Sequence, residues 1–416
     1  MKYDIHRVRA EFPSLAVTDN GAARVYFDNP GGTQVAKRVM TRMMDYFTTM
    51  NTNHGGAFIT SRQTDALLED AHRAMADLVG ATDPGEIVFG QNMTTLTLHI
   101  SRSIGNTLKA GDEIVVTRMD HDANISPWLL MAKDHGVTVK WLDFDPDTYK
   151  YDLTSLASNL SSKTKLVAVN YASNAIGTVN DVKTIAKMAH QVGALVYVDA
   201  VQLTPHFVTD VKDIDCDFLA CSAYKFYGPH QGLLWGRREL LEKLKPYKVR
   251  PADNALPHAW ETGTQSHEGM AGTLGSIEHM EWIGTEMGDG GASRRQRIVS
   301  GFHAVAAYER SICARLIRGL ENIQGVTVHG LTDEADFGNR VPTVAITKQG
   351  AHPRAMAESL GKENIFVWDG NYYAIEVIER LGLTDKGGML RIGLGQYNTD
   401  AEVDAILNHL DRKSSF

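Results

Sequence analysis

Short apolar runs alternate with longer amphipathic stretches over the first two thirds of the chain. The short runs are rich in β-branched residues, as is typical of buried strands, and they lie at residues 86–89, 113–117, 137–141, 164–169, 194–198 and 217–221. Helical spacing of apolar residues marks the stretches 63–79, 125–134 and 182–192 between them. This alternation predicts an α/β fold in which helices cover both faces of a mostly parallel sheet.

The pattern changes after Gly272. A long helix is predicted over residues 293–323, followed by short strands at 326–329 and 343–346 and by a closing helix over 400–411. We therefore predict a large domain over residues 21–285 and a small α+β domain over 286–416, with the N-terminal segment 1–20 packing on the small domain. The glycines within residues 287–292 favour a hinge or loop between the two domains.

Composition narrows the class of protein. The chain has 416 residues, 43% of them hydrophobic, and can bury a large core. Its net charge of −8 and its lack of long basic runs argue against nucleic acid or an anionic membrane as a partner. No apolar run approaches the roughly 18 residues that span a bilayer, and the first residues lack the apolar stretch of a signal peptide, so we expect a cytoplasmic protein.

The number and spacing of cysteines and histidines indicate neither a disulfide framework nor a metal site. The three cysteines, Cys216, Cys221 and Cys313, are too few for a disulfide framework and lack the paired spacing of a zinc site. The 16 histidines include no His-Glu-x-x-His motif. We therefore expect no structural or catalytic metal.

Several polar residues follow the predicted strands. Ligands of open α/β sheets bind beyond the carboxyl ends of the strands, so one pocket can gather these side chains. They are Asn92, His121, Asn174, Asp199 and Lys225.

Two of these residues point to pyridoxal 5'-phosphate. The amine of Lys225 can form a Schiff base with the cofactor's aldehyde, and the carboxylate of Asp199 can pair with the pyridine nitrogen so that the ring accepts electrons. Each has a simpler alternative, a solvated surface lysine and a turn or helix-capping aspartate. Burial of a lysine directly after an apolar strand costs free energy unless its charge is compensated or used. This cost favours the role in cofactor binding.

Eight motifs in order carry a resemblance to a known family. They are VYFDNPGGTQ, GQNMTTLTLH, MDHDANISPW, VNYASNAIGTVN, VDAVQ, CSAYKFYGP, WETGTQSHEG and RIGLGQYNT. With them the chain resembles the class V aminotransferases, pyridoxal-phosphate enzymes of fold type I, and within them the cysteine desulfurase and selenocysteine lyase branch. The resemblance implies a seven-stranded sheet in the large domain. It also implies a homodimer in which each active site is completed by the partner subunit.

The resemblance also assigns roles. Phosphate contacts fall to residues that open a helix or carry hydroxyl groups, with a threonine from the neighbouring subunit: Asn92, Met93, Thr94, Ser222, Tyr224 and Thr264. Around the cofactor ring the roles fall to a stacking histidine, the partner of the nitrogen and two amides: His121, Asp199, Gln202 and Asn174. The substrate contacts are assigned to the candidate carboxylate clamp and its neighbours: Arg391, Gly31, Gly32, His54 and Tyr373. Structural roles remain as alternatives, namely a loop amide, a structural histidine, a capping threonine or a surface arginine.

The chain departs from the desulfurase pattern at two places. The loop over residues 367–374 contains no cysteine, although desulfurases use a thiolate there to take up sulfur as a persulfide. The residue before Lys225 is Tyr224, as in the related kynureninases, where desulfurases usually have histidine. Persulfide chemistry is therefore disfavoured.

The sequence thus predicts an enzyme that depends on pyridoxal phosphate and acts on a small L-amino acid or derivative. The favoured reaction is a lyase reaction by β-elimination or C–S type cleavage, without a persulfide. Two alternatives stay open: a class V aminotransferase, and a pyridoxal-phosphate-binding protein without catalytic activity.

Overall fold

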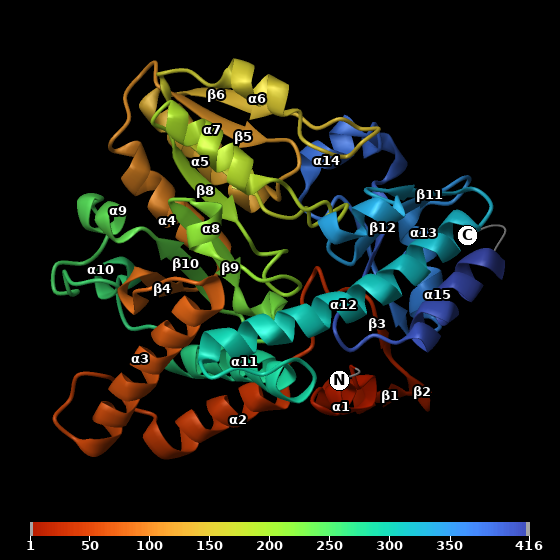
Figure 1. Ribbon diagram of the computed structural model, residues 1–416, viewed down its shortest axis with the longest axis horizontal. Coiled ribbons are helices and arrows are strands. Elements are labelled where there is room, and N and C mark those ends of the chain that lie inside the picture. Colours follow the sequence, from red (N-terminus) through yellow and green to blue (C-terminus); the bar gives the residue numbers. More distant parts are fainter. Residues whose placement is uncertain (1–2, 413–416) are drawn as a thin grey trace.

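The computed structural model describes residues 3–412 and contains the predicted sheet (Figure 1). Its seven strands lie in the order β4-β10-β9-β8-β7-β5-β6. They are β4 (Ile87–Gly90), β5 (Glu113–Thr117), β6 (Thr138–Leu142), β7 (Thr164–Asn170), β8 (Leu195–Asp199), β9 (Phe218–Ser222) and β10 (Gly232–Gly236). Only β10 runs antiparallel to its neighbours. The predicted α/β fold with a mostly parallel seven-stranded sheet is confirmed.

Helices cover both faces of this sheet. The residues of β5 alternate between two separate apolar clusters, with Val115 in one and Ile114 and Val116 in the other. The first cluster takes in the helices α2 (Lys37–Asp45), α3 (Ile59–Val79), α7 (Val182–Gln191), α8 (Val211–Ile214) and α11 (His267–Glu286). The second takes in α4 (Met93–Gly105), α5 (Ser126–His135), α9 (Arg238–Lys243) and α10 (His258–Glu261). Another helix, α6 (Leu153–Asn159), precedes β7.

A second, antiparallel sheet follows in the chain. Its order is β11-β12-β15-β14, and its strands are β11 (Val326–His329), β12 (Thr343–Lys348), β14 (Trp368–Gly370) and β15 (Met389–Gly393). Its apolar core is shared with the helices α12 (Arg294–Glu321), α13 (Pro353–Gly361) and α15 (Asp400–Arg412). The helix α14 (Ile375–Arg380) packs in a further cluster with Met119 and Phe144. These two residues follow strands β5 and β6 of the large sheet, respectively.

The N-terminal segment packs beside α12 and α15 (Figure 1). Its elements are α1 (Ile5–Ala10) and the short strands β1 (Thr18–Asp19), β2 (Ala22–Ala23) and β3 (Val25–Tyr26), and β3 pairs in parallel with β13 (Ile365–Phe366). Tyr3 stacks on Tyr308 at 4.4 Å between ring centroids, and Arg9 pairs with Glu402 at 2.8 Å. The segment thus brings residues 28–33 to the space between the two sheets.

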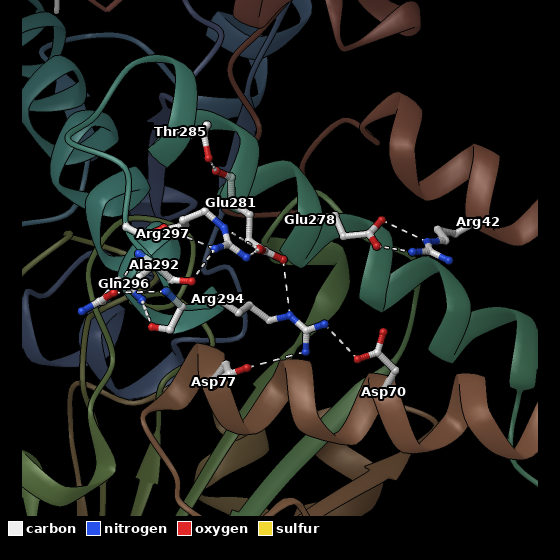
Figure 2. Close-up of polar contacts among 12 residues, drawn as sticks. Arg42, Asp70, Asp77, Glu278, Glu281, Thr285, Ala292, Arg294, Gln296 and Arg297 are labelled. Carbon is white, nitrogen blue, oxygen red and sulfur yellow. Dashed lines mark hydrogen bonds and ion pairs between the residues drawn. The ribbon is translucent and has the colours of Figure 1, made fainter.

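An ion-pair network ties the helices α3, α11 and α12 together (Figure 2). Arg294 at the start of α12 contacts Asp70 of α3 at 2.8 Å and Glu281 of α11 at 3.4 Å. Arg297 pairs with the same Glu281 at 2.6 Å. Residues 287–292, where we predicted a hinge or loop, form the loop between α11 and α12, and Ser300 accepts hydrogen bonds from two of its amides. Over residues 3–412, no helix has both the length and the apolar character needed to cross a membrane.

Candidate active site

A cavity of about 300 Å³ lies at the carboxyl ends of the parallel strands, between the two sheets. Most of the predicted site residues line it. They are Gly31, Asn92, Met93, Thr94, His121, Asn174, Asp199, Gln202, Ser222, Tyr224, Lys225, Tyr373 and Arg391. The fold therefore brings together residues that lie up to 360 positions apart in the sequence.

Three predicted residues do not line this cavity. A Cβ atom added to Gly32 would lie 3.5 Å from the Tyr224 ring, so Gly32 packs against the side chain of this lining residue. His54 and Thr264 lie instead at a second cavity, together with His258 and Glu261. A single chain does not carry these two side chains to the first cavity, and their predicted roles require a second subunit.

Lys225 follows strand β9 and reaches the N-terminal segment. Its Nζ donates hydrogen bonds to the carbonyl oxygens of Pro30 and Gly31, the second at 3.0 Å. Burial, followed by the charge of the nearby Arg391, lowers the pKa of Lys225 to about 7. A substantial fraction of the amine is therefore neutral at about pH 7, and the neutral form is the one that attacks an aldehyde.

Asp199 ends strand β8 at the floor of the cavity. One carboxylate oxygen accepts a hydrogen bond from the Val201 amide at 2.9 Å, and burial raises the pKa of Asp199 to about 6. A second carboxyl, Asp120, is fully buried nearby, and burial together with the charge of Asp199 raises its pKa well above the usual range. Asn124 donates to Asp120 at 2.7 Å, and the Asn170 amide donates at 3.1 Å. With its raised pKa, the Asp199 carboxyl is suited to pair with a protonated group, such as a pyridinium nitrogen.

His121 presents an uncharged ring to the cavity. Burial, followed by the charges of Lys225 and Arg391, lowers the pKa of His121 to about 4. Its Nδ1 accepts a hydrogen bond from the Ala123 amide at 3.0 Å. The ring stacks on Tyr373 with centroids 5.5 Å apart. A neutral, fixed imidazole suits stacking against a flat ligand.

The start of α4 offers an anion site at one end of the cavity. Asn92 caps the helix by accepting from the Thr95 amide at 2.9 Å, and Met93 and Thr94 supply the first amides of the helix. Ser222 lies beside them, because its Oγ accepts from the Met93 amide at 3.3 Å. Backbone amides at a helix start, together with a hydroxyl group, can bind phosphate. Gly232 of β10 allows this approach, since an added Cβ would overlap the Asn92 backbone.

Arg391 lies buried at the opposite end, on strand β15. Its Nη2 pairs with Asp28 at 2.9 Å, and its Nη1 donates to the Asn174 carbonyl oxygen at 3.1 Å. The guanidinium carbon stands 4.5 Å from the Tyr372 ring centroid. The Nε of Arg391 and the Oδ1 of Asn174 are buried without a partner. Buried polar atoms normally have a partner, so these two atoms fit a polar ligand in the cavity.

The loop over residues 367–374 is held in a strained conformation. Tyr372 and Tyr373 both have positive φ, at 56° and 58°. The Tyr372 carbonyl oxygen accepts from Asn174 at 2.9 Å, and that of Tyr373 accepts from the Asp122 amide at 2.7 Å. These bonds fix the backbone of both tyrosines beside the cavity.

No thiol of this chain lines the cavity. Cys216, Cys221 and Cys313 are all buried and free, and burial raises the pKa of Cys221 to about 12. The same cause raises the pKa of the other two thiols. Across residues 3–412, no group of three or more histidine, cysteine, aspartate or glutamate side chains has a metal-binding arrangement.

Eight lining residues were not among the predicted site residues, and the polar contacts of two of them, Asp28 and Asn170, help to shape the site. Asp28 precedes the Gly31-Gly32 pair, and an added Cβ at Gly31 would overlap its carboxylate. This close contact explains why the position needs glycine. In the sequence, the Gly31-Gly32 pair was the only indication of it. Asn170 ends strand β7 and donates to the Met119 carbonyl oxygen at 2.9 Å. Its position after an apolar run is the same signal that pointed to Asp199.

Known proteins are similar over the whole chain. The family model for aminotransferase class-V matches residues 25–406. The aminotransferase-like protein FGM3 of Gibberella zeae is 32% identical over 98% of both chains. A probable cysteine desulfurase of Synechocystis sp. is 33% identical over 98% of this chain and 95% of its own. The apo structure of cysteine desulfurase from Thermococcus onnurineus NA1 is 26% identical, with a TM-score of 0.87 over 99% of this chain and 98% of the other.

These findings confirm the resemblance seen in the eight motifs. They extend from the early strands to the last helix, and they include both the sheet and the loops that line the cavity. The chain therefore belongs to the class V aminotransferase family and is a pyridoxal-phosphate-dependent enzyme of fold type I, similar to the cysteine desulfurases.

Proposed function

We propose that this enzyme is a lyase that expels a β-substituent, as in C–S type cleavage, from a small L-amino acid or a derivative, without forming a persulfide on the protein. The observation that carries the proposal is a cavity that combines Lys225, Asp199 and Arg391 but has no thiol. The first two residues suit the cofactor, and the third suits a substrate carboxylate. A thiolate is the group needed to take up sulfur, and none lines the cavity.

Pyridoxal phosphate fits the residues present. The start of α4 and Ser222 would hold its phosphate, Asp199 its ring nitrogen and Lys225 its aldehyde carbon, with His121 against the ring. When bound, the cofactor draws electrons away from the substrate Cα and so makes its proton acidic.

The protein's own groups then handle the substrate. Arg391 binds the α-carboxylate, because it lines the cavity and a guanidinium can meet a carboxylate with two parallel hydrogen bonds. Lys225, with its lowered pKa, accepts the Cα proton and can return it or pass it to a leaving group. His121 stays neutral at pH 7 and keeps the ring in place.

A second subunit would complete the site. We propose a homodimer in which Thr264 reaches the phosphate of the neighbouring site and His54 approaches the substrate there. The position of both side chains away from the cavity of their own chain supports this arrangement.

An aminotransferase is the second candidate. The name of the Gibberella zeae relative, an aminotransferase-like protein, favours it. The same proton transfers serve both reactions, and the outcome depends on whether a β-substituent leaves or a proton is added at the cofactor. Retention of Lys225, Asp199 and Arg391 in one cavity supports catalysis over a role in cofactor binding alone.

The test is a parallel assay of products. The enzyme loaded with pyridoxal phosphate is given a panel of L-amino acids, including cysteine, and pyruvate, ammonia, sulfide and amino transfer to keto acids are measured. We expect keto acid and ammonia in equal amounts. A variant with Cys216, Cys221 and Cys313 all replaced by alanine should turn over the same substrate at a similar rate per folded molecule. Amino transfer alone would favour the aminotransferase, and a persulfide on any of these thiols would restore the desulfurase reaction.

A further inference from the structure

Trp368 is an exposed aromatic residue at the cavity. It lines the cavity, yet 53% of its surface is exposed. It is also the one exposed tryptophan among the six in the chain. A large exposed ring at the mouth of a binding site is a candidate contact for a ligand.

The strand register places this ring beside the substrate clamp. Trp368 of β14 lies directly opposite Arg391 of β15 in the antiparallel pair. Side chains of directly opposite residues project from the same face of a sheet. A carboxylate held by Arg391 therefore leaves the rest of the substrate next to Trp368.

Two further aromatic residues continue this surface. Tyr372 packs under the Arg391 guanidinium, and Tyr373 stacks on His121 while 69% of its surface stays exposed. We call Trp368, Tyr372 and Tyr373 the aromatic wall. Hydrogen bonds to the backbone of the two tyrosines hold these two residues in place, and pairing of β14 with β15 places Trp368 beside them.

We infer that the substrate is a derivative of a small L-amino acid whose β-substituent carries an aromatic group, bound against the aromatic wall at Trp368. This inference rests on the proposed function, because it takes Arg391 as the carboxylate clamp. Stacked and edge-to-face ring pairs add affinity beyond that of simple burial, whereas a small aliphatic side chain would leave Trp368 in water.

The experiment compares two amino acids that differ only by a phenyl ring. Binding of L-phenylalanine and L-alanine to the enzyme loaded with pyridoxal phosphate is measured by calorimetry. Neither ligand carries a leaving group on Cβ. We expect phenylalanine to bind at least about tenfold more tightly than alanine. The emission of Trp368, taken as the difference between the spectra of the enzyme and of Trp368→Phe, should also shift to shorter wavelength with phenylalanine.

Variants separate the wall from the clamp. Trp368→Ala should remove most of the preference for phenylalanine and leave the affinity for alanine unchanged, whereas Trp368→Phe should keep the preference. Leu130→Ala is the matched control, since Leu130 is 56% exposed and lies outside the cavity. Arg391→Ala should weaken both ligands by a similar factor.

The outcomes distinguish this inference from the proposed function. Equal affinity for the two ligands, or an unchanged preference in Trp368→Ala, would overturn the inference alone. So would an emission that is already that of a buried tryptophan and does not respond to phenylalanine, because a partner subunit would then cover the ring. If neither amino acid binds, the proposed function fails and the inference fails with it.

Discussion

The surroundings of Lys225 lower its pKa. An exposed lysine stays protonated until pH 10 or above, but burial and the nearby Arg391 bring the pKa of Lys225 to about 7. Because the charged form is the one disfavoured, the neutral amine gains population as the pH rises through 7. The carbonyl oxygens of Pro30 and Gly31 accept its hydrogen bonds and keep the nitrogen directed into the cavity.

We predict that the attachment of pyridoxal phosphate to this residue follows the titration of its amine. The initial rate of attachment should rise about tenfold between pH 6 and pH 7.5 and change little above pH 8. Borohydride reduction followed by peptide mapping should place the cofactor on Lys225, and Lys225→Ala should keep the fold while losing turnover. A rate that still climbs steeply between pH 9 and pH 10, or a label on another lysine, would contradict the assignment.

At the scale of elements, α11 and α12 cross at contacts that only glycine allows. A Cβ added at Gly284 of α11 would overlap the carbonyl oxygen of Arg297, and one added at Gly301 of α12 would overlap that of Met280. The backbones therefore touch directly, and the ion pairs of Glu281 lie one turn away (Figure 2). This crossing holds α12 against the large sheet while the rest of α12 packs on the second sheet.

Gly284→Ala should therefore lower stability by at least about 2 kcal/mol, because the added methyl group meets backbone that cannot move aside. Gly361→Ala is a suitable control, since no atom lies within 4 Å of the added Cβ. The midpoint of thermal unfolding, taken at fixed protein and cofactor concentration, measures the difference. If both variants unfold at the same temperature, the helices do not cross this closely in solution.

The elements also show what sequence patterns can and cannot predict. Runs rich in β-branched residues located six strands of the large sheet to within a residue or two at each end. Strand β10, Gly232–Gly236, was missed because two of its five residues are glycine and its neighbours carry turn residues. Strands β14 and β15 have no such run of their own, and their pairing with distant segments stabilises them.

The candidate site divides in the same way. Asp199 and Lys225 could be proposed from the sequence, because a charged side chain directly after an apolar strand suggests a functional role. The contact of Asp28 with Arg391 was not visible, since it joins positions 363 residues apart and depends on the packing of the N-terminal segment. The placement of Trp368 beside Arg391 likewise follows from strand register, which no local pattern encodes.

At the scale of the whole molecule, the proposed dimer makes each subunit a donor to the other's site. Thr264→Ala should weaken binding of pyridoxal phosphate by about 10- to 100-fold, the effect of losing one hydrogen bond to a charged group. The expected reason is that the phosphate loses a contact from across the interface. Cofactor titration measures the loss.

Mixed dimers locate that contact. Co-expression of Thr264→Ala with Lys225→Ala chains should restore one complete site in each mixed dimer, built from the lysine of one chain and the threonine of the other. The two variants alone should show weak cofactor binding and no turnover, respectively. A mixed dimer no more active than its parents would mean that Thr264 acts within its own chain.

The three buried cysteines have a consequence for how the protein can be studied. Each thiol lies within the apolar core with its pKa raised, so a reagent in water meets no reactive sulfur while the chain stays folded. Cys216 precedes strand β9, Cys221 lies within that strand, and Cys313 lies on α12. Alkylation of the first two thus reports opening of the large sheet, and alkylation of the third reports release of the long helix. The rates of alkylation of the three native thiols therefore report the order in which these parts of the protein unfold.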